Sequence, residues 1–158
     1  MNTQIIPLQN IFPDLDRYGS LLIKIGDFGV SKRIPPDSDT FLRTNVGSTN
    51  YVAPEIIKQD GEYSPTVDCF SVGCVIYRLV TSTNLFETLW DIFKHSQSGD
   101  PSHELGLDEI GCSEDCISFV GGLLRVDPTD RLTAAAALEH PWVSLGLPHQ
   151  ITNKLRGR

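Results

Sequence analysis

Residues 65–81 are apolar on nearly every face of a helix, and this stretch constrains the fold more than any other. Ser64 can cap a helix N-terminus, and Pro65 suits the first helical position. A helix without a polar face must be surrounded by other elements. We therefore predict a central helix over residues 65–81 that is covered on all sides. Its apolar residues are Val67, Phe70, Val72, Val75, Ile76, Leu79 and Val80.

The residues before this helix predict less regular structure. An apolar run over residues 21–25 stops at Gly26, which is typical of a strand that enters a turn. Residues 34–50 hold prolines and many short polar residues without periodicity, so they predict a long loop. Loops of this length in a compact domain are usually functional or disordered. A short helix over residues 55–58 is predicted after Pro54.

Three further helices are predicted after the central one. Ser113, followed by two acidic residues, predicts the cap of a helix that runs to about residue 124. Thr133 opens a last helix that must end before Pro141. The fold class is therefore mainly α, a helical bundle with a small β element at its N-terminal end. An amphipathic helix is also predicted from the helical spacing of Phe86, Leu89, Trp90 and Phe93.

Composition excludes several classes of partner. The 158 residues are 40% hydrophobic, which is typical of one compact globular domain. A net charge of -7 with scattered Lys and Arg predicts no nucleic-acid partner and no binding to a membrane surface. Long apolar segments of the kind found in transmembrane helices or signal peptides are absent from the sequence. We expect an intracellular protein, cytoplasmic or nuclear.

The cysteines and histidines follow no metal-binding pattern. Their spacings match neither a Cys-x-x-Cys pair nor a zinc knuckle. We expect reduced, partly buried thiols and histidines that lie at the surface or pack in the core. The cysteines are Cys69, Cys74, Cys112 and Cys116.

A series of short motifs carries the functional signal. Residues 27–29 read Asp-Phe-Gly, a tripeptide that is weak on its own because an Asp before a turn is often only a turn former. The order and spacing of four further motifs make chance agreement improbable. They are Ala53-Pro54-Glu55, Asp68 with Ser71 and Gly73, Asp127-Pro128 with Arg131, and His140-Pro141-Trp142.

With these motifs, residues 21–143 resemble the C-terminal half of the protein kinase catalytic domain. The loop FLRTNVGSTNYVAPE is most similar to the Ser/Thr-specific branch that includes calmodulin-dependent and AMP-activated kinases. The resemblance implies an incomplete kinase fold, with an activation segment over residues 27–55 and a helical core over 64–143. Residues 1–20 are then a degenerate catalytic-loop remnant and residues 144–158 a flexible tail.

The resemblance also implies a metal corner. In the family the Asp of Asp-Phe-Gly binds the Mg²⁺ ions that bridge the ATP phosphates, and Asp27 supplies such a hard anionic ligand. Phe28 would pack beneath the cleft, and Gly29 would let the chain turn into the following loop. Asn10 matches the family's second metal ligand. ATP and Mg²⁺ are therefore the cofactors expected of the intact family.

Three charged residues match structural positions of the family. Glu55 and Arg131 are similar to its buried ion pair, which fixes the end of the activation segment to the lower helices. Asp68 resembles a helix-buried Asp that accepts hydrogen bonds from the catalytic-loop backbone. The alternative for Glu55 and Asp68 is a solvated surface carboxylate.

The activation segment holds candidates for substrate positioning and regulation. Ser48 matches a hydroxyl that helps to position the substrate, with Tyr51 packing nearby. Thr44 matches the usual phosphosite of an upstream activating kinase, and its phosphate would order the loop only if cations meet it. Lys32 occupies the position of one such cation. The alternative is that Thr44 is simply a polar loop residue.

The resemblance fails at the catalytic loop. Under the same alignment its His, Arg, Asp and Lys positions hold Thr3, Gln4, Ile5 and Pro7. Ile5 cannot accept a proton, and Pro7 cannot neutralise a phosphate. Nor does the sequence hold a Gly-rich loop or strand Lys, so we expect this chain to be inactive alone, with binding of ATP doubtful. We also expect it to be a truncated product or gene-model fragment that exposes an apolar patch.

Two function hypotheses remain. The first is a Ser/Thr protein kinase, a transferase that phosphorylates protein substrates. The second is a pseudokinase-like binding module, whose helical lobe, including the helix with Trp90, docks a protein partner.

Overall fold

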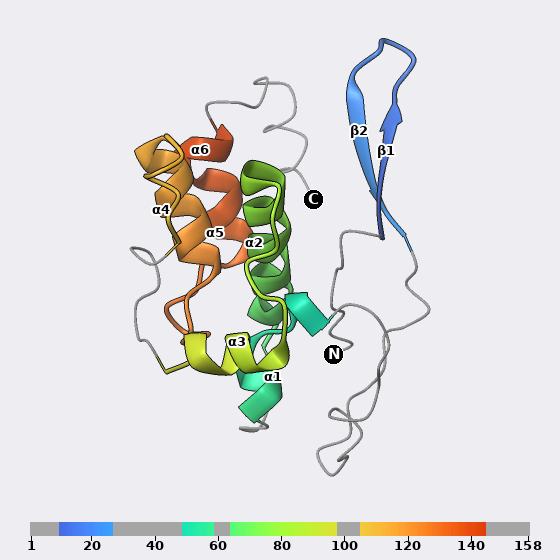
Figure 1. Cartoon of the computed structure of the whole chain (residues 1–158). Coiled ribbons are helices and arrows are strands. Elements are labelled where there is room, and N and C mark those ends of the chain that lie inside the picture. Colours follow the sequence, from blue (N-terminus) through green and yellow to red (C-terminus); the bar gives the residue numbers. More distant parts are fainter. Residues whose placement is uncertain (1–9, 27–48, 59–63, 98–104, 145–158) are drawn as a thin grey trace.

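The computed structural model describes residues 10–26, 49–58, 64–97 and 105–144. It is mainly α with one antiparallel hairpin, which confirms the predicted fold class. Figure 1 shows the hairpin to one side of a bundle of helices. In chain order the elements are β1 (Ile11–Leu15), β2 (Leu21–Ile25), the 3-10 helix η4 (Thr49–Tyr51), α1 (Pro54–Lys58), α2 (Thr66–Thr81), α3 (Leu89–His95), α4 (Glu114–Leu123), α5 (Ala134–Glu139) and α6 (Pro141–Ser144).

Helix α2 is the centre of the bundle, as the sequence predicts. α4 and α5 lie along it, and α3 crosses near one of its ends (Figure 1). Gly73 allows the close approach of α4, because a Cβ at this position would meet side-chain atoms of Leu123 and Leu124 at 3.0 Å. The main core is the cluster of Tyr51, Val52, Ala53, Ile56, Val67, Phe70, Cys74, Val75, Phe86, Ile92, Leu105, Leu107, Cys116, Val120 and Leu124.

Two details of the α2 prediction are wrong. The helix begins at Thr66, with Pro65 as the N-cap residue rather than the first helical one. Ser64 still contributes, because its Oγ accepts a hydrogen bond from the Thr66 N–H at 3.3 Å. The helix is also not covered on all sides by the described residues, since Leu79 is 67% exposed.

Helix α3 covers only part of the apolar pattern that predicts an amphipathic helix, because Phe86 lies before its first residue. Thr88 and Asp91 form a capping box, which fixes the start of the helix at Leu89. Ile92 and His95 are the buried residues of the helix. Trp90 is 62% exposed and stacks on Phe93, which is 38% exposed, with ring centroids 5.2 Å apart. The predicted apolar side of this helix thus faces solvent in part.

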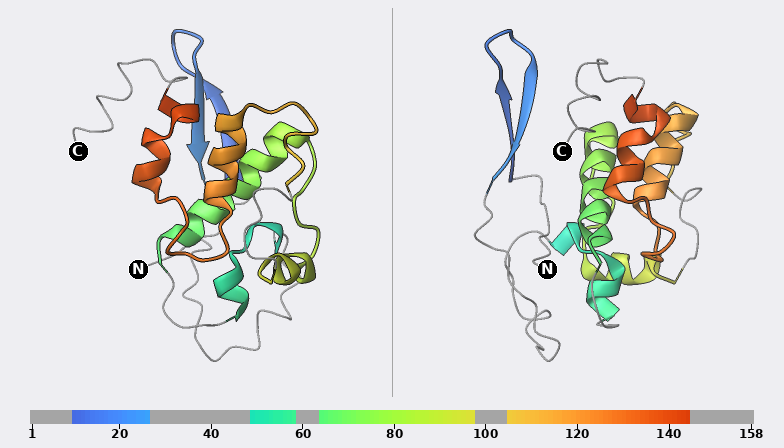
Figure 2. Two further views of the ribbon diagram at one scale, coloured as in Figure 1. Left: turned by 90° about the vertical axis from the view of Figure 1, so that its left-hand side faces the viewer. Right: turned by 180° about the vertical axis from the view of Figure 1, so that it is seen from behind.

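The hairpin contains the predicted strand over residues 21–25 and a partner that the sequence did not predict. β1 pairs with β2 in antiparallel register, with Ile11 opposite Ile25 and Leu15 opposite Leu21. Figure 2 shows the pair beside the helical bundle when it is viewed from behind. Ile11 at its base packs against the main core.

The helices at the C-terminal end start where the sequence predicts. Ser113 caps α4 by accepting from the Cys116 N–H, and Thr133 caps α5 by accepting from the Ala136 N–H. α6 follows at once and was not predicted. The four cysteines are free thiols, as expected. Within the described segments, no helix has the length and apolar character needed to cross a membrane.

Candidate functional site

The candidate site is built around an ion pair between α1 and the turn that precedes α5. Arg131 Nη1 donates to Glu55 Oε1 at 2.6 Å, and Arg131 Nη2 donates to Glu55 Oε2 at 2.8 Å. The Arg131 side chain is fully buried, and that of Glu55 is 14% exposed. The structure therefore brings together these two predicted site residues, and Glu55 is not a solvated surface carboxylate.

The guanidinium of Arg131 has an acceptor for each of its five N–H groups. Besides the two carboxylate oxygens, Nε donates to the Arg125 carbonyl at 2.9 Å, Nη1 to the Thr66 carbonyl at 3.0 Å and Nη2 to the Val126 carbonyl at 3.2 Å. A buried charge is tolerated when its donors are all satisfied. Arg131 thus ties together α1, the start of α2 and the chain that leaves α4.

The same guanidinium lies over an aromatic ring of the main core. Arg131 Cζ is 5.1 Å from the centroid of the Phe70 ring. A cation is attracted to the face of an aromatic ring, and this attraction is stronger where water is excluded. Phe70 is fully buried and stacks on Phe86, with centroids 6.0 Å apart. The ion pair therefore rests directly on the central helix.

The turn that delivers Arg131 is shaped by Asp127. Its Oδ1 accepts from the Thr129 N–H at 2.8 Å and from the Thr129 hydroxyl at 2.7 Å. These hydrogen bonds, from the hydroxyl first and then from the backbone, lower the pKa of Asp127. Asp and Pro are residues that favour tight turns. The Asp127-Pro128 motif thus folds the chain back so that Arg131 points into the bundle.

The segment before Glu55 is attached to α2 by a second contact. Ser71 Oγ donates to the Tyr51 carbonyl at 2.7 Å, and both residues are buried. Val52, Ala53 and Pro54 are also buried. The chain from Tyr51 to Glu55 is thereby held against the helices at both ends. Sequence reasoning noted Ser71 only as part of a motif, because a hydroxyl that reaches a carbonyl far along the chain leaves no local pattern.

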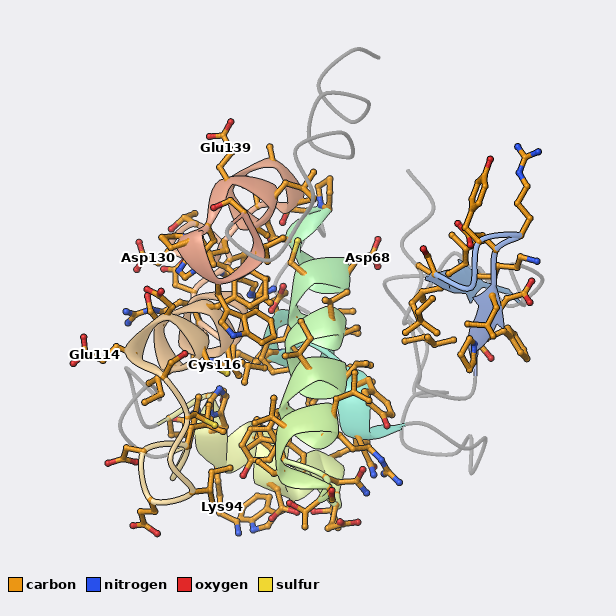
Figure 3. The ribbon with its side chains drawn as sticks, turned by 90° about the horizontal axis from the view of Figure 1, so that it is seen from above. Asp68, Lys94, Glu114, Cys116, Asp130 and Glu139 are labelled. Carbon is orange, nitrogen blue, oxygen red and sulfur yellow. The ribbon has the colours of Figure 1, made fainter. Side chains whose placement is uncertain are left out.

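Asp68 lies in the first turn of α2 and is half-buried. Figure 3 labels its carboxylate on the side of α2 away from α4. The residues it was predicted to meet, in the catalytic-loop region before Asn10, lie outside the described residues.

The hairpin base is the described part of the predicted metal corner. The Gly26 N–H donates to the Asn10 carbonyl at 2.9 Å, and Asn10 is only 9% exposed. Asn10 immediately precedes β1, and Gly26 immediately follows β2, so both lie at the same end of the hairpin. Asp27 is the next residue in the sequence and is not among those described. The other predicted residues outside the described ranges are Ile5, Phe28, Gly29, Lys32, Thr44 and Ser48.

Among the described residues, no group of three or more His, Cys, Asp or Glu side chains could hold a metal ion. The predicted donor pair combines the amide oxygen of Asn10 with the carboxylate of Asp27. Oxygen donors of these two kinds are the ligands that Mg²⁺ takes in proteins. The hydrogen bond between the Gly26 N–H and the Asn10 carbonyl holds the two ends of the hairpin together.

Comparison with known proteins agrees with the motifs. A family model described as the protein kinase domain matches residues 6–143. The chain is 36% identical over 138 residues to the serine/threonine-protein kinase RAD53 of Saccharomyces cerevisiae, covering 79% of this chain and 17% of that protein. It is 40% identical over 123 residues to CDPK-related kinase 5 of Arabidopsis thaliana, covering 77% of this chain and 20% of that protein.

Solved structures show the same relationship. The crystal structure of the Rad53 kinase domain and SCD2 in complex with AMPPNP matches with a TM-score of 0.62 and 34% identity, covering 96% of this chain and 51% of that one. The chain thus spans about half of this kinase structure and about a fifth of the curated relatives. With the family match over most of its length, this chain belongs to the protein kinase domain family.

Proposed function

We propose that the chain forms the C-terminal lobe of a serine/threonine protein kinase, an enzyme that transfers the γ-phosphoryl group of ATP to protein hydroxyls. The observation that carries this proposal is the Arg131 site. The fully satisfied guanidinium of Arg131 holds Glu55, and the Ser71 hydroxyl holds Tyr51, so both ends of this segment are attached to the helices. Phosphoryl transfer depends on positioning, so the end of an activation segment needs such an anchor. The proposed lobe covers residues 21–143, with the activation segment over 27–55 and a tail after 143.

In this proposal the metal corner lies at the hairpin base. Asn10 and Asp27 would hold Mg²⁺, which supplies charge neutralisation at the ATP phosphates. Phe28 and Gly29 would shape the chain beyond Asp27. Asp68 would orient the catalytic-loop backbone from the start of α2. Asn10 is supported by its burial and by its hydrogen bond to Gly26.

The activation segment would position the protein substrate. Ser48 would help to position the substrate, with Tyr51 packing nearby, and this packing role of Tyr51 is supported by its burial and by the hydrogen bond that its carbonyl accepts from Ser71. Thr44 would accept a phosphate from an upstream kinase, and Lys32 would meet that charge. The similarity to relatives named as serine/threonine-protein kinases supports a Ser/Thr-specific segment, and its assignment to the calmodulin-dependent and AMP-activated branch stays a prediction.

By itself, the 158-residue chain is expected to transfer no phosphate. Ile5 stands where the family has the proton-accepting Asp, and Pro7 where it has the Lys. Neither side chain can take a proton or stabilise the transferring group. The measurement is incorporation of labelled γ-phosphate into Ser- and Thr-containing peptides, with the Asp27→Asn variant as matched control. Transfer by the parent chain that this substitution abolishes would contradict the expectation.

A binding module is the second candidate, and the exposed pair of Trp90 and Phe93 favours it. These rings stack on each other at the surface of α3 rather than packing into the core. Exposed aromatic residues are enriched at protein interfaces. A binding module would transfer no phosphate, even when joined to a nucleotide-binding lobe. The kinase proposal requires that the lobe then takes part in phosphoryl transfer.

A further inference from the structure

Helix α2 carries an arginine near its C-terminal end that has no carboxylate partner among the described residues. Arg78 lies in the last turn of α2 and is half-buried. Its Nη1 donates a hydrogen bond to the side-chain oxygen of Asn84. In the part of the chain that the structure describes, ion pairs are formed by Lys24, Lys94 and Arg131 instead. The guanidinium charge of Arg78 is therefore met by a neutral amide.

The fold holds this guanidinium in place. Ser82 ends α2 with a φ of 62° and donates its N–H to the Arg78 carbonyl at 2.8 Å. The chain then turns back, so that Asn84 lies beside the Arg78 side chain. Asn84 Nδ2 also donates to Glu87 Oε1 at 3.2 Å, which fixes the amide from its other side. Arg78 is thus oriented before any ligand binds, and such preorganisation favours affinity.

Arg78 lies on the face of α2 that holds the end of the activation segment. The Glu55 carboxylate and the Thr66 carbonyl, at the start of α2, accept from the same guanidinium nitrogen. The Tyr51 carbonyl accepts from Ser71, further along the helix. From Glu55 back to Tyr51 the segment therefore follows α2 toward its C-terminal end. Arg78 comes seven residues after Ser71, so it shares this face and lies about 10 Å further along the axis.

We propose that Arg78 is a specificity-determining residue that binds an aspartate or glutamate side chain of the protein substrate. The inference rests on the proposed kinase function, in which Ser48 helps to position the substrate and Tyr51 packs nearby. A carboxylate that meets a guanidinium forms charge-assisted hydrogen bonds, often two at once. The pairing is stronger at a half-buried position than in open water. A lysine or arginine of the substrate would be repelled at the same place.

A role in the helix alone is the alternative for Arg78. A cation in the last turn of a helix interacts favourably with the helix dipole, and this role needs no ligand. The two roles predict different results for Arg78→Met. Loss of a dipole interaction lowers the stability of α2 and leaves the choice between substrates unchanged. Loss of a substrate contact changes that choice.

The experiment measures equilibrium binding of labelled peptides to the full 158-residue chain by fluorescence anisotropy. Three peptides of equal length carry one serine flanked by Glu, Gln or Lys residues. The Glu peptide should bind at least about tenfold more tightly than the Lys peptide at a physiological ionic strength of about 0.15 M. The net charge of -7 attracts the Lys peptide at long range, so the overall charge of the chain cannot produce this order.

Three variants of Arg78 and one control assign the preference. Arg78→Lys should keep the preference for the Glu peptide, Arg78→Met should remove it, and Arg78→Glu should reverse it. The control is Arg17→Glu, which makes the same change of charge at the tip of the hairpin, away from the bundle (Figure 1). It should bind the three peptides in the same order as the parent chain. Circular dichroism of each variant shows that the helices are intact.

The proposal is overturned if the parent chain binds the Glu peptide no more tightly than the Lys peptide. It is also overturned if Arg78→Glu and Arg17→Glu change the order of binding equally. Because binding is measured without ATP, the result does not depend on phosphoryl transfer. Selective binding of the Glu peptide by a lobe that transfers no phosphate in a complete kinase domain would contradict the kinase function and still support the Arg78 site. Equal transfer to all three peptides would contradict the Arg78 site alone.

Discussion

Replacement of Arg131 by methionine is expected to cost about 3–5 kcal/mol of the free energy of unfolding. The substitution removes the partner of a Glu55 carboxylate that is only 14% exposed. It also removes the donors to the Arg125, Thr66 and Val126 carbonyls. Buried groups that lose their partners carry the full cost of desolvation. Because small domains are stable by about 5–15 kcal/mol, the variant should lie close to unfolding.

Urea denaturation followed by circular dichroism measures this loss. The control is Lys94→Met, which removes a pair with Asp91 at 3.2 Å whose lysine side chain is 59% exposed. Exposed pairs contribute at most about 1 kcal/mol. A double-mutant cycle with Glu55→Gln would assign the coupling to the pair itself. If the free energy of unfolding of Arg131→Met lies within about 1 kcal/mol of that of the parent chain, Arg131 does not anchor the segment before α2.

The second large effect is expected from Phe70→Ala, which should lower the free energy of unfolding by about 3–5 kcal/mol. Phe70 is fully buried in α2 and packs edge to face with His95, at a centroid distance of 6.1 Å, besides its contacts with Phe86 and Arg131. Its removal leaves a cavity under the ion pair and takes away the ring on which the guanidinium lies. The expected loss therefore combines the transfer of the ring with the unfilled cavity.

Leu79→Ala is the matched control, because Leu79 lies on the same helix but is 67% exposed. Leu79→Ala should change the free energy of unfolding by no more than about 0.5 kcal/mol. Thermal unfolding of both variants by calorimetry gives the comparison. Equal destabilisation by the two substitutions would show that helix propensity, rather than packing of Phe70, limits the stability of α2.

Elements with local signals could be predicted from the sequence. Ser113 and Thr133 each cap the helix that follows, and both caps accept from the expected backbone N–H groups. α5 ends before Pro141, because proline has no backbone N–H to donate to the helix. Elements that depend on distant contacts could not be predicted. β1 contains Pro13 and exists only through its pairing with β2, which no pattern within residues 11–15 reveals.

The contacts of the candidate site also divide into those that could be predicted from the sequence and those that could not. Glu55 and Arg131 are 76 residues apart, so only the family resemblance indicated that they meet. The backbone acceptors of Arg131 could not be predicted, because their positions depend on the turn that Asp127 shapes. The apolar spacing of Trp90 and Phe93 predicted an amphipathic helix but not which of its residues are buried, because that depends on the elements that pack against α3.

The most direct test of the kinase proposal is phosphoryl transfer by a chimera. Residues 10–143 of this chain would replace the matching part of the Rad53 kinase domain, whose crystal structure is a complex with AMPPNP. In the kinase family, the retained part carries the nucleotide-binding lobe and the catalytic Asp. We predict Mg²⁺-dependent transfer to Ser or Thr peptides that falls at least about a hundredfold on Asp27→Asn. A chimera that melts cooperatively and binds nucleotide, yet transfers no more phosphate than its Asp27→Asn variant, would contradict the proposal and favour the binding module.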